Sequence, residues 1–95
     1  MSFLGRFRRS KPDPEIARRT LLLQSGRLGD ATILEINRDG EGNELLSYCY
    51  TIGGVDYETT QRLDAEQLSR KDSYLPGSRV AMRYDPHRPT NSLIV

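Results

Sequence analysis

The chain has 95 residues, of which 36% are apolar and 28% charged, and it contains no Trp. This composition suits one small folded domain, and it excludes a disordered chain and a catalytic cleft between two domains. The net charge of +1 is unevenly divided: residues 1–27 carry seven basic and two acidic residues, whereas residues 28–95 carry seven basic and eleven acidic. A basic N-terminal arm therefore precedes a mildly acidic body, which indicates an interaction through the arm.

The chain has one cysteine, Cys49, and one histidine, His87. This pair excludes an internal disulfide and a structural zinc site, and we expect neither a metal nor another cofactor. No stretch approaches the roughly 20 apolar residues of a membrane-spanning helix, and the N-terminus lacks the apolar region of a signal peptide. We therefore expect a cytoplasmic protein.

Residues 1–12 are interpreted as a basic, flexible leader, and residues 13–26 as a helical segment. Asp13 can cap a helix, Pro14 suits the first helical position and Gly26 can end it, so a helix is predicted over 14–25.

One face of this predicted helix is apolar. Ile16, Thr20 and Leu23 lie at i, i+4 and i+7, and Leu21, Leu22 and Ala17 widen the apolar coverage. Because so short a helix is not stable alone, we expect it to dock on the rest of the domain.

From Asp30 the apolar residues repeat every second position, which predicts strands. Residues 31–36 form the first strand and 37–43 a polar turn. Gly53 and Gly54 then read as a two-residue hairpin turn, whose register keeps the apolar residues of both strands on one face. The facing pairs predicted by this turn are Ile52 with Val55, Tyr50 with Tyr57, Tyr48 with Thr59, and Leu46 with Gln61.

The remaining residues predict one helical turn from Asp64, a turn at Pro76-Gly77, a strand over 79–85 and a short last strand over 92–95. In the 79–85 strand, the inward side chains are Val80, Met82 and Tyr84. We therefore predict a mainly β fold: residues 27–95 form a small, partly closed barrel of five antiparallel strands, SH3-like or OB-like, preceded by one helix.

The C-terminal stretch "YDPHRPTNSLIV" completes a recognisable order of features. A small residue opens the first strand, aromatic alternation leads into a Gly hairpin, and Pro-Gly precedes a Val-rich strand; Tyr84-Asp85-Pro86, Pro89 and a closing Ser-Leu follow. Over about residues 26–95 the chain resembles the bacterial domain-of-unknown-function family thirty-five ninety-two. The resemblance implies a small all-β domain, often beside transmembrane helices, and brings no established activity or catalytic residues. Here a basic leader stands in place of such helices.

The same C-terminal stretch has a functional and a structural interpretation. Asp85, His87 and Arg88 could form an acid/base pair or a ligand clamp. Alternatively, Asp85 accepts hydrogen bonds from nearby backbone N–H groups while Pro86 and Pro89 set the bend into the last strand. We favour the structural interpretation, because turns built from Asp and Pro are far commoner than sites.

The hairpin tyrosines and the cysteine each have a functional and a structural interpretation as well. Tyr48, Tyr50 and Tyr57 share a face that could stack nucleic-acid bases, but their alternation is also what a half-buried hairpin needs, and we favour core. A thiol enzyme using Cys49 with His87 is the remotest hypothesis, since no base or positive charge is near Cys49 in sequence.

The leader offers the candidate binding residues. Its apolar residues are spaced i, i+1 and i+4 among basic ones, which suits an anionic membrane surface, an acidic protein partner or RNA. The candidates are Phe3, Arg6, Phe7, Arg8, Arg9 and Lys11. We expect a non-enzymatic interaction or accessory module with no small-molecule substrate, recruited by this leader to a protein partner or to the inner-membrane surface. The alternative is a nucleic-acid-binding barrel that uses the leader and the hairpin tyrosines.

Overall fold

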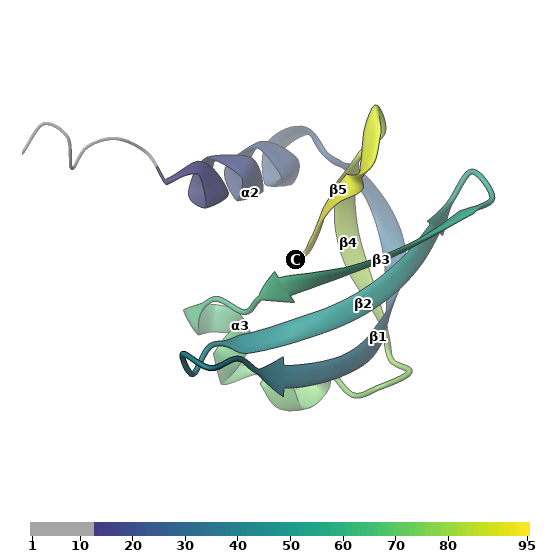
Figure 1. Ribbon diagram of the computed structural model, residues 1–95. Coiled ribbons are helices and arrows are strands. Elements are labelled where there is room, and N and C mark those ends of the chain that lie inside the picture. The colour runs from purple at the N-terminus through teal and green to yellow at the C-terminus, as the bar shows by residue number, and fades with distance from the viewer. Residues whose placement is uncertain (1–12) are drawn as a thin grey trace, which may run out of the picture.

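The computed structural model describes residues 13–95. Five antiparallel strands in the order β3-β2-β1-β4-β5 curl into a nearly closed barrel, and the N-terminal helix lies against β4 and β5 (Figure 1). This arrangement confirms the predicted fold class. The elements are α2 (Pro14–Ser25), β1 (Arg27–Arg38), β2 (Glu44–Ile52), β3 (Val55–Arg62), α3 (Ala65–Ser69), the 3-10 turn η1 (Lys71–Ser73), β4 (Arg79–Asp85) and β5 (Arg88–Ile94).

Strand β1 changes partner along its length. Residues 27–32 pair with β4, residues 32–38 pair with β2, and the register shifts between Ile33 and Glu35. Such an irregularity bends a strand and lets a sheet of few strands curl on itself. The predicted strand over 31–36 is confirmed but is longer at both ends, because pairing with β4 extends it toward the helix.

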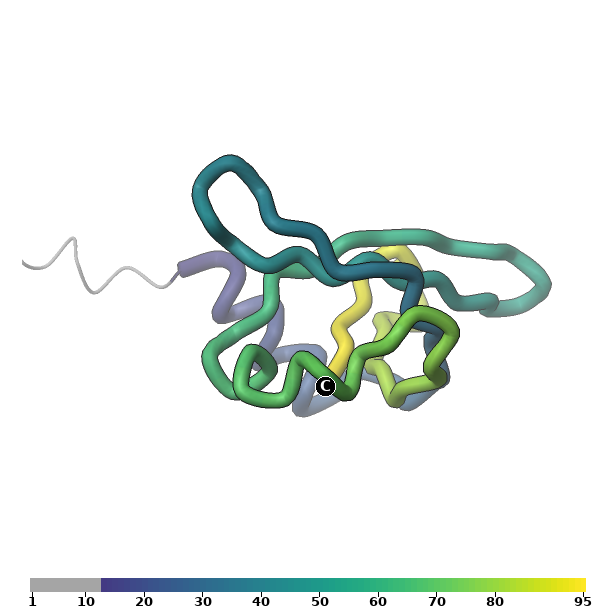
Figure 2. The backbone as a smooth tube through the Cα atoms, turned by 90° about the horizontal axis from the view of Figure 1, so that it is seen from below, coloured from purple at the N-terminus to yellow at the C-terminus, as the bar shows by residue number. Residues whose placement is uncertain are grey.

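The β2–β3 hairpin has the predicted register in every pair, from Ile52 opposite Val55 to Leu46 opposite Gln61. Gly53 and Gly54 take φ values of +60° and +83°, which a primed two-residue turn requires and which side chains with a Cβ rarely adopt. The tube view shows this hairpin projecting from the barrel (Figure 2).

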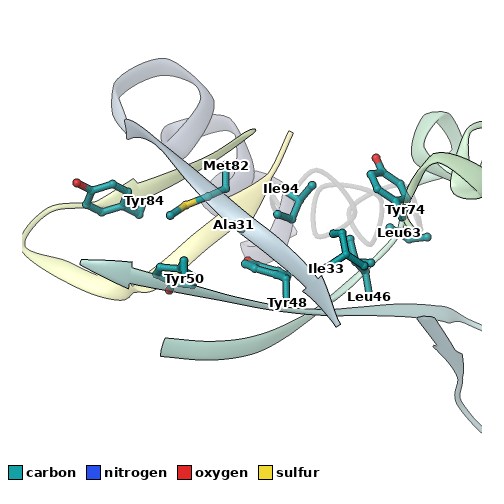
Figure 3. Packing of buried hydrophobic residues seen from close by; sticks show 10 residues of the cluster. All are labelled: Ala31, Ile33, Leu46, Tyr48, Tyr50, Leu63, Tyr74, Met82, Tyr84 and Ile94. Carbon is teal, nitrogen blue, oxygen red and sulfur yellow. The ribbon is translucent and has the colours of Figure 1, made fainter. Parts of the chain in front are cut away.

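One cluster of side chains fills the barrel. Its buried members come from β1, β2, β4 and β5 and from the segment between β3 and β4, and Figure 3 shows them gathered between the strands. Strand β3 contributes the half-buried Tyr57, which packs against the cluster. The members are Ala31, Ile33, Leu46, Tyr48, Tyr50, Leu63, Tyr74, Met82, Tyr84 and Ile94. The predicted inward direction of Met82 and Tyr84 is therefore confirmed.

The two end strands of the sheet, β3 and β5, are joined by side chains. The Gln61 carboxamide accepts a hydrogen bond from the Ile94 N–H (2.8 Å) and donates one to the Ile94 carbonyl (3.2 Å). Gln67, which also forms a capping box with Asp64 at the start of α3, donates to the same carbonyl (2.9 Å). Nearby, the hydroxyl groups of Tyr48 and Ser92 lie 2.7 Å apart. The Gln61 side chain thus makes the hydrogen bonds to Ile94 that the backbone of a neighbouring strand would otherwise make, and it closes the barrel.

The predicted helix over 14–25 is confirmed, with Asp13 capping its start and Gly26 its end, but the helix does not dock through the apolar face of Ile16 and Leu23. Leu22 is the one buried residue of α2, at 3% exposure, whereas Ile16 and Leu23 are 63% and 51% exposed. The reason is that the helix docks mainly through polar groups.

Two arginines of α2 make these docking contacts. Arg18 Nη1 donates to the Asn91 side-chain oxygen and the Ser92 carbonyl, both at 2.9 Å. Arg19 Nη2 donates to the Arg62 carbonyl (2.7 Å). These acceptors lie in β5 and at the end of β3. The face of α2 that carries Arg18 and Arg19 is therefore the face that contacts the barrel.

The C-terminal hairpin differs from the predicted corner. The chain reverses at Pro86-His87, and the last strand begins at Arg88 rather than at residue 92. Pro89 therefore lies within β5, beside a register irregularity that falls between Tyr84 and Asp85. The predicted local role of Asp85 is confirmed, since its carboxylate accepts the His87 N–H at 2.9 Å.

Candidate functional site

The residues singled out from the sequence do not form one site. All six leader candidates, Phe3, Arg6, Phe7, Arg8, Arg9 and Lys11, lie outside the described residues. Gly53 and Gly54 form an exposed turn, and the Tyr84 side chain belongs to the core. His87 is exposed in the β4–β5 turn, whereas Cys49 lies mid-strand in β2, and no hydrogen bond joins them. The polar C-terminal cluster is therefore a turn.

The hairpin tyrosines are core residues. Tyr48 is fully buried and Tyr50 is 4% exposed; burial raises the pKa of Tyr48 to about 12 and also raises that of Tyr50. The Tyr50 hydroxyl donates to the Pro89 carbonyl. Tyr57 is half-buried and stacks on Tyr50 with ring centroids 5.3 Å apart. Since a base-stacking platform must be open to its ligand, Tyr48 and Tyr50 cannot supply one.

The charged residues of α2 are gathered on its inner face. Glu15 accepts from Arg18 Nη2 at 2.8 Å and from Arg19 Nε at 2.6 Å. These hydrogen bonds, with that of Arg18 dominant, lower the pKa of Glu15 from 4.5 to about 2. All three charged side chains of the helix are thus committed to one cluster that holds α2 on the barrel.

The outer face of α2 is consequently free of charge. Its most exposed apolar side chains are Ile16 and Leu21, each 63% exposed, and Leu23. Every exposed residue of this helix is uncharged: Pro14, Ile16, Ala17, Thr20, Leu21, Leu23, Gln24 and Ser25. A surface helix ordinarily turns its apolar stripe inward and its charges to solvent. Here the arrangement is reversed, which makes this exposed apolar face a candidate interaction surface.

A second candidate surface lies where β1 and β2 separate. Their last paired residues are Thr32 and Cys49, beyond which β1 pairs only with β4 and β2 only with β3. The separation leaves a groove of about 680 Å³. Tyr50, Tyr57 and Cys49 line it together with the polar side chains Asp30, Thr32, Thr51, Asp56, Glu58 and Arg79. Three carboxylates and one guanidinium group therefore line the groove.

Three buried polar residues whose hydrogen bonds join β5 to the rest of the barrel were not identified from the sequence. They are Gln61, Gln67 and Ser92. A signal for Gln61 was present. The hairpin register places it on the inward face opposite Leu46, and a polar side chain at an inward position needs a buried hydrogen-bond partner. Nothing local in the sequence identifies Ile94 as that partner.

Fold and surfaces together define a small β-barrel domain with a helix across its rim and two open surfaces. The family model for the domain of unknown function DUF3592 matches residues 29–95, so the chain belongs to that family. No curated protein and no solved structure matches the chain. Between residues 13 and 95, neither helix has the length and apolar character needed to cross a membrane. Within the same range, no group of three or more His, Cys, Asp or Glu residues could hold a metal ion.

Proposed function

We propose that this protein is a non-enzymatic interaction module recruited to an anionic membrane surface by its basic leader and the outer face of α2. The observation that carries this proposal is the reversed helix, whose three charged residues face the barrel while Ile16, Leu21 and Leu23 face outward. A non-enzymatic role is supported by the position of Cys49 in the middle of β2, where it makes no hydrogen bond to His87, the base that a thiol nucleophile would need.

The leader and the helix face are continuous in sequence. Residues 1–12 contain four basic and no acidic residues, together with Phe3, Leu4 and Phe7, and they lead directly into the Asp13 cap of α2. Each basic residue near an anionic surface contributes about 1 kcal/mol, and a buried Leu or Ile side chain contributes about 1.5–3 kcal/mol. Several such contributions give the micromolar, reversible binding of a peripheral protein.

The charge of the rest of the chain favours one orientation. Residues 28–95 carry seven basic and eleven acidic residues, so an anionic surface repels the barrel while it attracts the leader. The barrel would therefore point away from the bilayer, and α2 would lie at the interface with its apolar residues toward the lipid.

Sedimentation with vesicles tests the proposal. The full chain should co-sediment with vesicles of phosphatidylserine and phosphatidylcholine in low salt, and not with phosphatidylcholine alone. The double variant Ile16→Ser with Leu23→Ser should bind at least about a hundredfold more weakly, and Phe3→Ser with Phe7→Ser should lose binding. Val55→Ser with Leu68→Ser is the matched control, because these side chains are also exposed but lie in β3 and α3.

Two outcomes would contradict the proposal. The first is no sedimentation of the full chain with the anionic vesicles. The second is equal binding by the helix variant and the control variant, which would show that the helix face does not contact the bilayer. An acidic protein partner would then be the remaining target for the leader.

A further inference from the structure

We propose that the groove between β1 and β2 binds the leader of a second copy of this chain as an added strand. The occupant is the segment Arg6-Phe7-Arg8 with its neighbours, and the result is concentration-dependent self-association. This inference does not depend on membrane recruitment, and its test contains no lipid.

The first reason is that both walls of the groove are strand edges without a partner. Within the described part of the chain, residues 27–31 of β1 pair only with β4, and residues 50–52 of β2 pair only with β3. An unpaired strand edge is a template for an extended peptide, which adds main-chain hydrogen bonds while its alternate side chains enter flanking pockets.

The second reason is that the groove has two chemically different sides. Asp56 and Glu58 lie on the outer face of β3, and Tyr57, between them, lies with Tyr50 on the inner face. Successive side chains of a strand point to opposite faces. An extended segment with basic residues at i and i+2 and an aromatic residue between them therefore matches both sides. Arg6, Phe7 and Arg8 have this pattern.

The third reason is charge complementarity. Asp30, Asp56 and Glu58 line the groove, and none of them takes part in an ion pair among residues 13–95. Asp56 accepts only the Thr51 hydroxyl, at 2.7 Å. Against one lining cation, Arg79, the groove has an excess of two negative charges, and the leader carries four basic and no acidic residues.

The position of α2 indicates a second copy as the source of the segment. In both views the start of α2 and the β2–β3 turn lie at opposite ends of the molecule (Figures 1 and 2). The leader precedes α2 at the first of these ends, whereas Asp56, Tyr57 and Glu58 of the groove directly follow the β2–β3 turn at the other. A neighbouring molecule can supply its leader without this constraint.

The test uses a fluorescent peptide of residues 1–12, titrated with the full chain and followed by anisotropy. The peptide should bind with micromolar affinity, and binding should weaken with salt. Asp30→Asn with Glu58→Gln should weaken binding about fivefold, as expected for two solvent-exposed ion pairs. Glu41→Gln with Asp72→Asn removes the same charge from exposed sites outside the groove and should leave affinity unchanged. A peptide with Arg6 and Phe7 exchanged, equal in charge, should bind more weakly.

Sedimentation velocity of the full chain completes the test. The sedimentation coefficient should rise with protein concentration, and the rise should be lost in Arg6→Glu with Arg8→Glu. Equal peptide affinity for the groove and control variants would overturn the proposal, as would equal affinity for the two peptide orders. A sedimentation coefficient that does not change with concentration would overturn the role of a second copy.

Discussion

Gln61 makes two of the three side-chain hydrogen bonds to Ile94 that close the barrel, and the substitution Gln61→Leu tests their contribution directly. Leucine is similar in volume and keeps the apolar contacts of the site, but it removes both hydrogen bonds to Ile94. The Ile94 carbonyl retains Gln67 as a donor, whereas the Ile94 N–H is left buried without an acceptor.

The expected cost follows from these contacts. A net hydrogen bond contributes about 1 kcal/mol, and a buried donor left without a partner costs about 1–3 kcal/mol. We therefore expect Gln61→Leu to lower the free energy of unfolding by about 2–4 kcal/mol. Domains of this size have stabilities of roughly 5–15 kcal/mol, so Tm should fall by more than about 10 °C.

Urea unfolding gives the free energy, and amide hydrogen exchange reports on closure itself. The Ile94 amide should exchange much faster in Gln61→Leu. Gln24→Leu is the matched control: Gln24 is exposed on α2, and its replacement should change stability by less than about 0.5 kcal/mol. Equal stability of Gln61→Leu and the control, with the Ile94 amide still protected, would refute the assignment of Gln61 as the closing residue.

Two further predictions concern the docking of α2. Leu22→Ala removes the one buried side chain of the helix and should cost about 2–3 kcal/mol in urea unfolding, whereas Leu21→Ala should be nearly neutral; equal costs would show that the helix docks on another face. Because the pKa of Glu15 is lowered from 4.5 to about 2, its contribution is complete above pH 4.5 and is lost as the pH falls toward 2. After allowance for solvent screening this amounts to about 1 kcal/mol, so Glu15→Gln should flatten the stability–pH curve in that range, and parallel curves for the two proteins would contradict the assignment.

The parts of the fold that were predictable are those set by local physics. The alternation around Gly53-Gly54 determines both the register of the hairpin and its inner face, because a slip by one residue would expose Tyr48 and Tyr50. The caps at Asp13 and Gly26 likewise determine where α2 begins and ends.

The orientation of α2 was not predictable in the same way. Periodicity shows which residues share a face, but not which face the barrel accepts. That choice depends on Arg18 and Arg19, whose acceptors lie 43 to 74 residues away in the sequence.

The groove was also beyond local reasoning. The groove exists because β1 pairs with β4 before Thr32 and with β2 after it. No residue near Thr32 indicates this change of partner in the sequence. Its lining combines β1, β2, β3 and the start of β4, so the three carboxylates come together only in the folded chain. The family match over residues 29–95 accounts for the barrel strands but leaves α2 outside it.

Tryptophan fluorescence measures directly whether the outer face of α2 enters a membrane surface, as proposed above. The chain contains no Trp, so Leu23→Trp introduces a single reporter on that face, and Val55→Trp introduces a matched reporter on the exposed β2–β3 hairpin. With phosphatidylserine-containing vesicles, the emission of Leu23→Trp should shift to the blue and be quenched by brominated lipid, while that of Val55→Trp should not change. Emission from Leu23→Trp that stays at its aqueous wavelength while the protein sediments with the vesicles would contradict the claim.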